Sequence, residues 1–224
     1  MSELHGRGSI VDLTLDGALQ TRITLSENIW LLRWSDYFPL EFEVPGFHCS
    51  IISPHAALHF AKQNHSKIFS ENQGQNFISD SAHPAKFRFY EKCADFFGLF
   101  KTDELIGIAI CNPSDWSTYY LRYFTVLPEF TGLGMISALV EHLCKILSNH
   151  GVQRAEAEFS PNNSMTQRFT TKLGFEVSGL SLSERYGSLV RTTKFLNLES
   201  ADSFHSQFCN ALPRQLNQGK FSGN

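Results

Sequence analysis

Apolar and polar positions alternate along the second half of the chain and divide it into short strands. Residues 94–101 (ADFFGLFK) and 105–113 (LIGIAICNP) are separated by Thr102-Asp103-Glu104, which predicts an antiparallel hairpin. Aromatic and β-branched residues in TYYLRYFTV, beginning at Thr118, predict a third strand. The period then changes to that of a helix closed by Gly151, with one apolar face formed by Ile136, Leu139, Val140, Leu143, Ile146 and Leu147.

The remaining pattern up to Leu196 completes an alternation of strands and helices. VQRAEAEFS (152–160) predicts a strand, and a short helix over 164–173 follows Asn163 and ends at Gly174. Residues 175–182 and 188–196 predict a closing hairpin. The resulting order β-β-β-α-β-α-β-β indicates the α/β class, with a mixed sheet and helices packed on its faces.

The ends of the chain are less regular. The alternation in VDLTLDGALQTRITL predicts a hairpin around Asp16-Gly17, and Ser53-Pro54 predicts the start of a helix running to Phe69. Residues 71–83 have the composition of a loop. We therefore expect an N-terminal β-rich extension with one helix (1–90), a core (91–196) and a polar, flexible tail (197–224). The tail has one marginal helix near Ser203 to Leu212.

Composition narrows the class of protein. The net charge is −3, so no basic field indicates binding to nucleic acid or to an anionic membrane. No apolar run reaches the roughly 20 residues of a membrane span, and the N-terminus lacks a signal-peptide core, so we expect a cytoplasmic protein. The five dispersed cysteines are typical of thiols in a reducing compartment. The 20 phenylalanines indicate either a Phe-rich core or a long apolar pocket.

The strongest candidate for chemistry is the connection after the third strand. Val126-Leu127-Pro128 ends that strand, and Glu129 to Gly134 lead into the amphipathic helix. A helix N-terminus presents unpaired main-chain N–H groups and roughly half a positive charge, and glycines let a ligand approach the main chain. This pattern predicts a phosphate site. The alternative is a tight connection in which the glycines serve turn geometry alone.

Two segments together carry a resemblance to a known family. VLPEFTGLGMISALVEHL and, further along, NNSMTQRFTTKLGFEVSG occur in the order and separation found in the GNAT (Gcn5-related N-acetyltransferase) superfamily. The resemblance covers about residues 94–196. It implies a central mixed sheet flanked by helices and an N-acyltransferase that uses acyl-CoA or acetyl-CoA as co-substrate. The co-substrate would be held by Val126, Leu127, Thr131, Gly132, Leu133, Gly134, Met135, Ile136, Ser137 and Asn163.

The phosphate turn departs from the family pattern at two positions. Thr131 stands where the family usually has Arg or Gln, so it keeps a hydroxyl donor and loses the charge. Ile136 places a branched side chain where the family often leaves room for the diphosphate. Because both departures affect the diphosphate-binding turn, acyl carrier protein, which lacks the adenine end of CoA, is an alternative acyl donor. Asn163 is expected to cap its helix and also to touch pantetheine.

The resemblance also implies catalytic roles that this sequence fills only in part. A main-chain N–H of Val126 or Leu127 would polarise the thioester. The strand around Tyr120 lacks the family's carboxylate, so Tyr120 acting through water and Glu158 are the candidate bases. In the family, a Tyr near the end of the second helix acts as general acid toward the departing thiolate. Thr170 occupies that place here, and its hydroxyl is a poor acid. The alternatives are Tyr186, unless it is a hairpin aromatic that covers the sheet, or a thiolate that leaves unassisted into bulk water.

Three functions remain open from the sequence. The first is transfer of an acyl group to a primary amine of a small molecule or peptide, with the first 90 residues shaping the acceptor side. The second is a fatty acyltransferase that lipidates a Lys or ornithine side chain of a ribosomal peptide. The third is a catalytically weak binding or sensor module. No metal site is expected. His55 and His59 are four residues apart, as in many metal sites, but the sequence offers no third ligand beside them. The oligomeric state is open, with a homodimer among the options.

Overall fold

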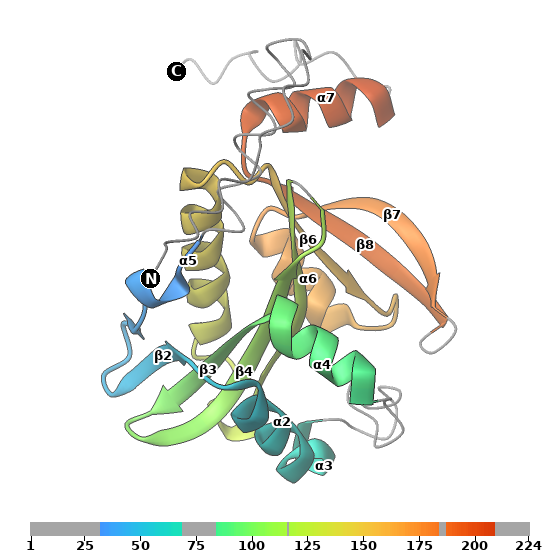
Figure 1. Cartoon of the computed structure of the whole chain (residues 1–224). Coiled ribbons are helices and arrows are strands. Elements are labelled where there is room, and N and C mark those ends of the chain that lie inside the picture. The colour runs from blue at the N-terminus through green and yellow to red at the C-terminus, as the bar shows by residue number, and fades with distance from the viewer. Residues whose placement is uncertain (1–31, 69–83, 116, 184–186, 209–224) are drawn as a thin grey trace, which may run out of the picture.

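A single mixed sheet runs through the computed structural model, which describes residues 32–68, 84–115, 117–183 and 187–208 (Figure 1). Its eight strands have the order β1-β2-β3-β4-β5-β6-β8-β7. Their bounds are β1 Leu40–Glu41, β2 Phe47–Ile51, β3 Asp95–Lys101, β4 Glu104–Pro113, β5 Thr118–Val126, β6 Arg154–Phe159, β7 Glu176–Ser183 and β8 Gly187–Phe195. Every neighbouring pair is antiparallel except β5 and β6, which are parallel. The predicted mixed α/β sheet is confirmed.

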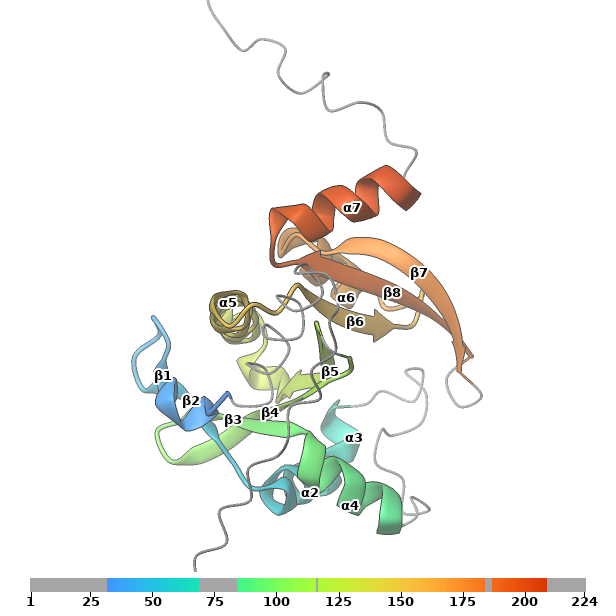
Figure 2. The same ribbon diagram turned by 45° about the horizontal axis from the view of Figure 1, so that its top comes forward.

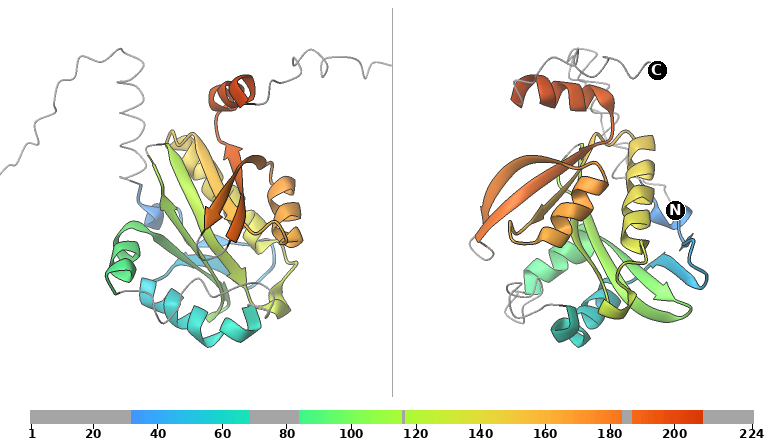
Figure 3. Two further views of the ribbon diagram at one scale, coloured as in Figure 1. Left: turned by 90° about the vertical axis from the view of Figure 1, so that its right-hand side faces the viewer. Right: turned by 180° about the vertical axis from the view of Figure 1, so that it is seen from behind.

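Helices lie on both faces of this sheet (Figure 3). The α-helices are α2 Pro54–Gln63, α3 His65–Ile68, α4 Pro84–Cys93, α5 Met135–Asn149, α6 Ser164–Lys172 and α7 Leu198–Phe208. Two short 3₁₀ helices, η1 Trp34–Asp36 and η2 Pro128–Phe130, complete the described elements. The order of strands and helices predicted between residues 94 and 196 is thus the observed one. None of the helices in the described ranges is long and apolar enough to cross a membrane.

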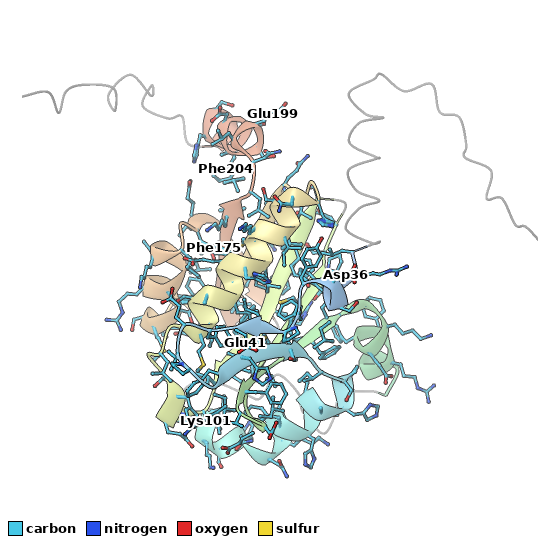
Figure 4. All side chains as sticks on the ribbon, turned by 90° about the vertical axis from the view of Figure 1, so that its left-hand side faces the viewer. Asp36, Glu41, Lys101, Phe175, Glu199 and Phe204 are labelled. Carbon is cyan, nitrogen blue, oxygen red and sulfur yellow. The ribbon has the colours of Figure 1, made fainter. Side chains whose placement is uncertain are left out.

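The larger core lies between the sheet and α5. Leu139, Leu143 and Leu147 are fully buried there, as their helical period predicts. Burying such a side chain contributes about 1.5–3 kcal/mol, so this face fixes α5 on the sheet. Figure 4 places Phe175, which follows α6, beside α5 in the same core. A second, smaller core lies on the opposite face, where Phe60 of α2 packs among Phe96 and Ile108.

The part of the chain before β3 joins the same sheet. β2 pairs along its whole length with β3, and β1 pairs with β2. The predicted helix after Ser53 is confirmed, with the Ser53 Oγ accepting from the Ala56 N–H at 3.1 Å. It is divided in two at Asn64, where the backbone leaves the helical conformation. Helix α4 was not predicted. The predicted hairpin around Asp16-Gly17 and the predicted loop over 71–83 lie outside the described residues.

The helix predicted in the tail begins earlier than expected. α7 begins at Leu198 and packs through Phe204 against Phe195 of β8, with 5.0 Å between ring centroids. Phe204 points from α7 toward the body of the protein in Figure 4. This contact between two residues nine positions apart fixes the helix against the end of β8.

Candidate active site

The two parallel strands at the centre of the sheet separate after a short paired stretch. Their register joins only Thr118 to Arg154, Tyr119 to Ala155 and Tyr120 to Glu156. Beyond Tyr120, β5 continues to Val126 and pairs with β4 alone, while β6 diverges (Figure 2). One edge of β5 is therefore left without a strand partner among the described residues. An open strand edge presents main-chain donors and acceptors to a ligand.

The direction of the β5 amides can be derived from one hydrogen bond. The Leu127 N–H donates to the Ile106 carbonyl oxygen at 2.8 Å, so Leu127 faces β4. Successive amides of a strand point to opposite neighbours, so the N–H groups of Val126 and Phe124 point toward the side where β6 has diverged. Val126 therefore fits the predicted oxyanion donor. Leu127 does not, because its N–H is already bonded and its side chain is buried.

The connection between β5 and α5 ends in an open helix N-terminus. Gly132 and Gly134 have φ of +81° and +78°, the left-handed region that glycine adopts without strain. Gly134 is the N-cap of α5 and supplies no capping side chain. The first hydrogen bond of the helix runs from the Ala138 N–H to the Gly134 carbonyl. The N–H groups of Met135, Ile136 and Ser137 thus have no partner within the helix.

This corner is not plugged by the described side chains. A Cβ atom placed on Gly132 or Gly134 would meet no atom within 4 Å. The Met135 side chain is buried, and the half-buried Ile136 packs against the main core. The corner therefore offers main-chain N–H groups and open space, which is what a phosphate requires.

Thr131 does not offer the hydroxyl donor that the sequence predicts. Its Oγ1 donates to the Pro128 carbonyl oxygen at 2.7 Å, so the hydroxyl proton is engaged in closing η2. The Leu133 side chain is 42% exposed and carries no polar group, so only its main chain could contact a phosphate. Lys101 lies close to this connection, with its Nζ 5.4 Å from the ring centroid of Phe130, the residue before Thr131. Figure 4 shows Lys101 beside this connection.

The second predicted ligand-binding segment is the start of α6. The Asn163 Oδ1 accepts from the Thr166 N–H at 3.0 Å, which confirms the predicted cap. Thr170 is buried, and its Oγ1 donates to the Thr166 carbonyl at 2.9 Å and the Gln167 carbonyl at 3.1 Å. A buried hydroxyl bonded to its own helix cannot protonate a leaving group. Thr170 is therefore excluded as the catalytic acid.

Tyr120 and Glu158 meet across the point where β5 and β6 separate. The Tyr120 hydroxyl donates to Glu158 Oε2 at 3.4 Å, while Arg191 and Ser181 donate to Glu158 Oε1 at 2.9 Å and 3.1 Å. The Glu158 side chain is 16% exposed, and that of Arg191 is 46% exposed. Burial, and after it the charge of Glu158, raises the pKa of Tyr120 to about 12. Tyr120 therefore keeps its proton at neutral pH and donates to Glu158.

Two further residues near this point were not predicted as site residues. Arg122 lies on β5 with its guanidinium 4.9 Å from the centroid of the Tyr120 ring and 4.7 Å from that of Tyr90. Tyr90 belongs to α4, the helix that the sequence pattern did not reveal. The period of two in the strand does place Arg122 and Tyr120 on one face, so this signal was present in the sequence. Tyr186, the predicted substitute acid, lies outside the described residues.

Comparison with known proteins agrees with this geometry. The sequence pattern of the acetyltransferase (GNAT) family matches residues 57–175. No protein of curated function matches the sequence significantly.

Solved structures share the fold at low sequence identity. Ribosomal-protein-S5-alanine acetyltransferase from Vibrio fischeri superposes with a TM-score of 0.54 and 13% identity, over 72% of this chain and 98% of that one. Ribosomal-protein-S18-alanine N-acetyltransferase from Escherichia coli has a TM-score of 0.52 and 18% identity, over 68% and 95%. The IAA acetyltransferase from Bacillus cereus has a TM-score of 0.52 and 10% identity, over 66% and 99%.

Proposed function

This chain belongs to the acetyltransferase (GNAT) family, and from that premise we propose that it transfers an acyl group from acyl-CoA to a primary amine of a small molecule or peptide. One observation carries the proposal. The same connection that leaves the amides of Met135 to Ser137 open at the start of α5 follows directly from the β5 edge that carries the Val126 N–H. A phosphate-bearing thioester could therefore be held at both its phosphate and its carbonyl ends.

The binding step uses main-chain groups. The amides of Met135, Ile136 and Ser137 would hold the pyrophosphate, with the helix dipole favouring its negative charge. The open edge of β5 would hydrogen-bond to the pantetheine amides as a neighbouring strand does. Asn163 would remain the cap of α6 and border the same site.

The chemical step needs a donor for the oxyanion and an acceptor for the proton of the amine. The Val126 N–H would donate to the thioester oxygen as its charge develops. Glu158 would take, through bound water, the proton that the amine loses as its nitrogen bonds to the carbonyl carbon. Tyr120, Arg191 and Ser181 orient Glu158 through their hydrogen bonds. The carbon–sulfur bond then breaks, and the thiolate takes a proton from water.

The position of the phenylalanines bears on the acyl chain. Phe47, Phe60, Phe96, Phe97, Phe159 and Phe175 are all buried. These buried side chains favour a Phe-rich core as the reason for the high number of phenylalanines. The number of phenylalanines therefore gives no separate support to a long-chain acyl donor. Because the Thr131 hydroxyl donates to the Pro128 carbonyl, it is not available to the diphosphate of CoA. Acyl carrier protein therefore stays the alternative donor to acyl-CoA.

Ligand-dependent stability followed by turnover tests the proposal. We expect acetyl-CoA or a longer acyl-CoA to raise the unfolding temperature, because a ligand that binds only the folded state stabilises it. We then expect free thiol to appear when a panel of primary amines is added. An acyl carrier protein thioester serves as the third donor. Failure of all three donors to stabilise the protein would refute the proposal, and binding without thiol release would favour a binding module.

A further inference from the structure

Besides Glu158, the site contains the charged side chain of Arg122, which lies on the same strand as Tyr120, at a β-bulge. In the register of β4 with β5, Ile110 faces Tyr123 and Cys111 faces Leu121, which leaves Arg122 as the extra residue. A bulge inserts one residue into a strand and re-aims its side chain, and bulges are frequent beside active sites. Arg122 therefore stands at the irregularity, on the face of β5 that also carries Tyr120.

Contacts with Asn112, Tyr90 and Tyr120 help to hold the Arg122 guanidinium in place. Its Nε donates to the Asn112 Oδ1 at 2.9 Å, and the Asn112 Nδ2 in turn donates to the Pro113 carbonyl at 2.8 Å. Asn112 is buried, so this support is rigid. The rings of Tyr90 and Tyr120 lie 4.7 Å and 4.9 Å from the guanidinium carbon. Aromatic faces attract a cation and orient it.

Tyr120 joins this cation to the proposed base. Its ring contacts Arg122, and its hydroxyl donates to Glu158. The side chain of Tyr120 therefore lies between the Arg122 guanidinium and the Glu158 carboxylate and contacts both. A small molecule bound there would meet a carboxylate at one end of Tyr120 and a planar guanidinium at the other.

We propose that the acceptor carries a carboxylate on the same molecule as the amine, so that Arg122 binds the carboxylate while the amine lies at Glu158. The substrate class is then free amino acids, or short peptides with both groups in reach. Arg favours carboxylates because its planar N–H groups match the two oxygens. This inference rests on the proposed function, since it takes Glu158 as the base. It also gives residues 1–90 a share in the acceptor side through Tyr90.

Paired acceptors test the proposal, each an amino acid and its amide, such as glycine with glycinamide and β-alanine with β-alaninamide. Thiol release from acetyl-CoA gives kcat/KM for each, and the ratio within a pair is independent of the folded fraction. We expect the wild type to prefer the carboxylates roughly tenfold to a hundredfold, as expected for one or two charge-assisted hydrogen bonds. Arg122→Gln should reduce the ratio to about one. Arg122→Lys should restore only part of it, because a lysine lacks the planar fork.

Arg33→Gln is the matched control, because it removes the same charge from an exposed position before η1. It should keep the wild-type ratio. A wild-type ratio near one, or a ratio that survives Arg122→Gln, would overturn the proposal while leaving acyl transfer intact.

Calorimetry supplies a readout that does not depend on turnover. The amino acids and amides are titrated into protein saturated with CoA. Carboxylate-selective binding that Arg122→Gln abolishes supports the proposal even if the proposed chemistry fails. Equal binding of both members of every pair, or binding of neither, counts against it.

Discussion

The Tyr120 hydroxyl donates to the Glu158 carboxylate at 3.4 Å, joining the last paired residue of β5 to a residue of β6 just beyond the point where the two strands separate. This contact places a half-buried carboxylate beside the open edge of β5. The same strand edge carries the Val126 N–H. The separation of the strands thus leaves Glu158 of β6 and the Val126 N–H of β5 on the same open side of β5.

Replacing Glu158 by Gln should lower kcat/KM for amine acylation by about 10²–10⁴-fold, because the amide cannot accept the proton of the amine. The change keeps the shape of the side chain, so the shift in unfolding temperature caused by acetyl-CoA should stay the same. Glu156→Gln is the matched control, since Glu156 is two residues earlier on β6 and pairs with Arg154 at 3.4 Å. Steady-state thiol release measures both variants. Equal activity of the two would remove Glu158 from the mechanism.

Replacing Tyr120 by Phe should have a smaller effect, a loss of about tenfold or less. Its raised pKa, about 12, means that Tyr120 supplies a hydrogen bond to Glu158 and no proton acceptor at neutral pH. Losing one donor to a carboxylate costs about 1.5 kcal/mol or less when two other donors remain. The pH profile of kcat/KM is the measurement. A loss as large as that of Glu158→Gln would assign Tyr120 a direct role.

At the start of α5, Gly134→Asp should abolish binding of acetyl-CoA. The new carboxylate would lie at the helix N-terminus and repel phosphate, and a Cβ at this position meets no described atom within 4 Å. Gly134→Asn is the control, because Asn has the same shape without charge and tolerates the left-handed backbone at least as well as Asp. Thermal shift with acetyl-CoA distinguishes them. If Asp and Asn reduce binding equally, the charge argument is wrong and only the backbone conformation matters.

Val126→Pro should leave the protein folded and lower kcat by about 10²–10³-fold. Proline removes the N–H that points away from β4, as is tolerated on an edge strand. Leu127→Pro instead removes the bond to the Ile106 carbonyl and should lower the unfolding temperature. Circular dichroism checks the fold, and thiol release at saturating donor gives kcat. A folded Val126→Pro variant with wild-type kcat would place the oxyanion elsewhere.

Local sequence patterns were sufficient for the strands from β3 to β8 and for α5. Period-two and helical alternation are short-range signals, and Asn163 and Gly151 mark helix ends through their own backbone and side-chain chemistry. The same reasoning located the open corner at Gly132 and Gly134. It missed α4, whose side chain Tyr90 contacts Arg122 of a strand far along the chain.

The features that decide the chemistry depend on register between strands. The separation of β5 from β6 and the bulge at Arg122 are set by which residues pair, and no single segment encodes this. Register also distinguishes Val126 from Leu127 as donor. The contacts of Thr170 could not be predicted for a different reason. Counting residues gives its place on α6, while its hydroxyl bonds back to the Thr166 carbonyl, as buried Thr in helices can.

Asp95 predicts a pH-dependent contribution to stability. Its carboxylate accepts from the Tyr119 hydroxyl at 2.5 Å, and burial raises its pKa although the hydrogen bonds from Tyr119 and Trp34 oppose the change. A carboxyl whose pKa is higher in the folded state binds its proton more tightly there. Its contribution to the free energy of unfolding is therefore fully present below the pKa of the unfolded chain, and is lost as pH rises through the folded pKa.

Denaturant unfolding of the wild type and Asp95→Asn at pH 4 and pH 7.5 tests this sign. The Asn variant cannot titrate, so the wild type should lose stability relative to it as pH rises, while all other groups cancel in the difference. Tyr119→Phe provides a second check, because removing a hydrogen bond that lowers the pKa of Asp95 should move the transition to higher pH. A difference between wild type and Asp95→Asn that stays constant with pH, or that grows in favour of the wild type, would show that the buried carboxyl keeps an ordinary pKa or a lowered one.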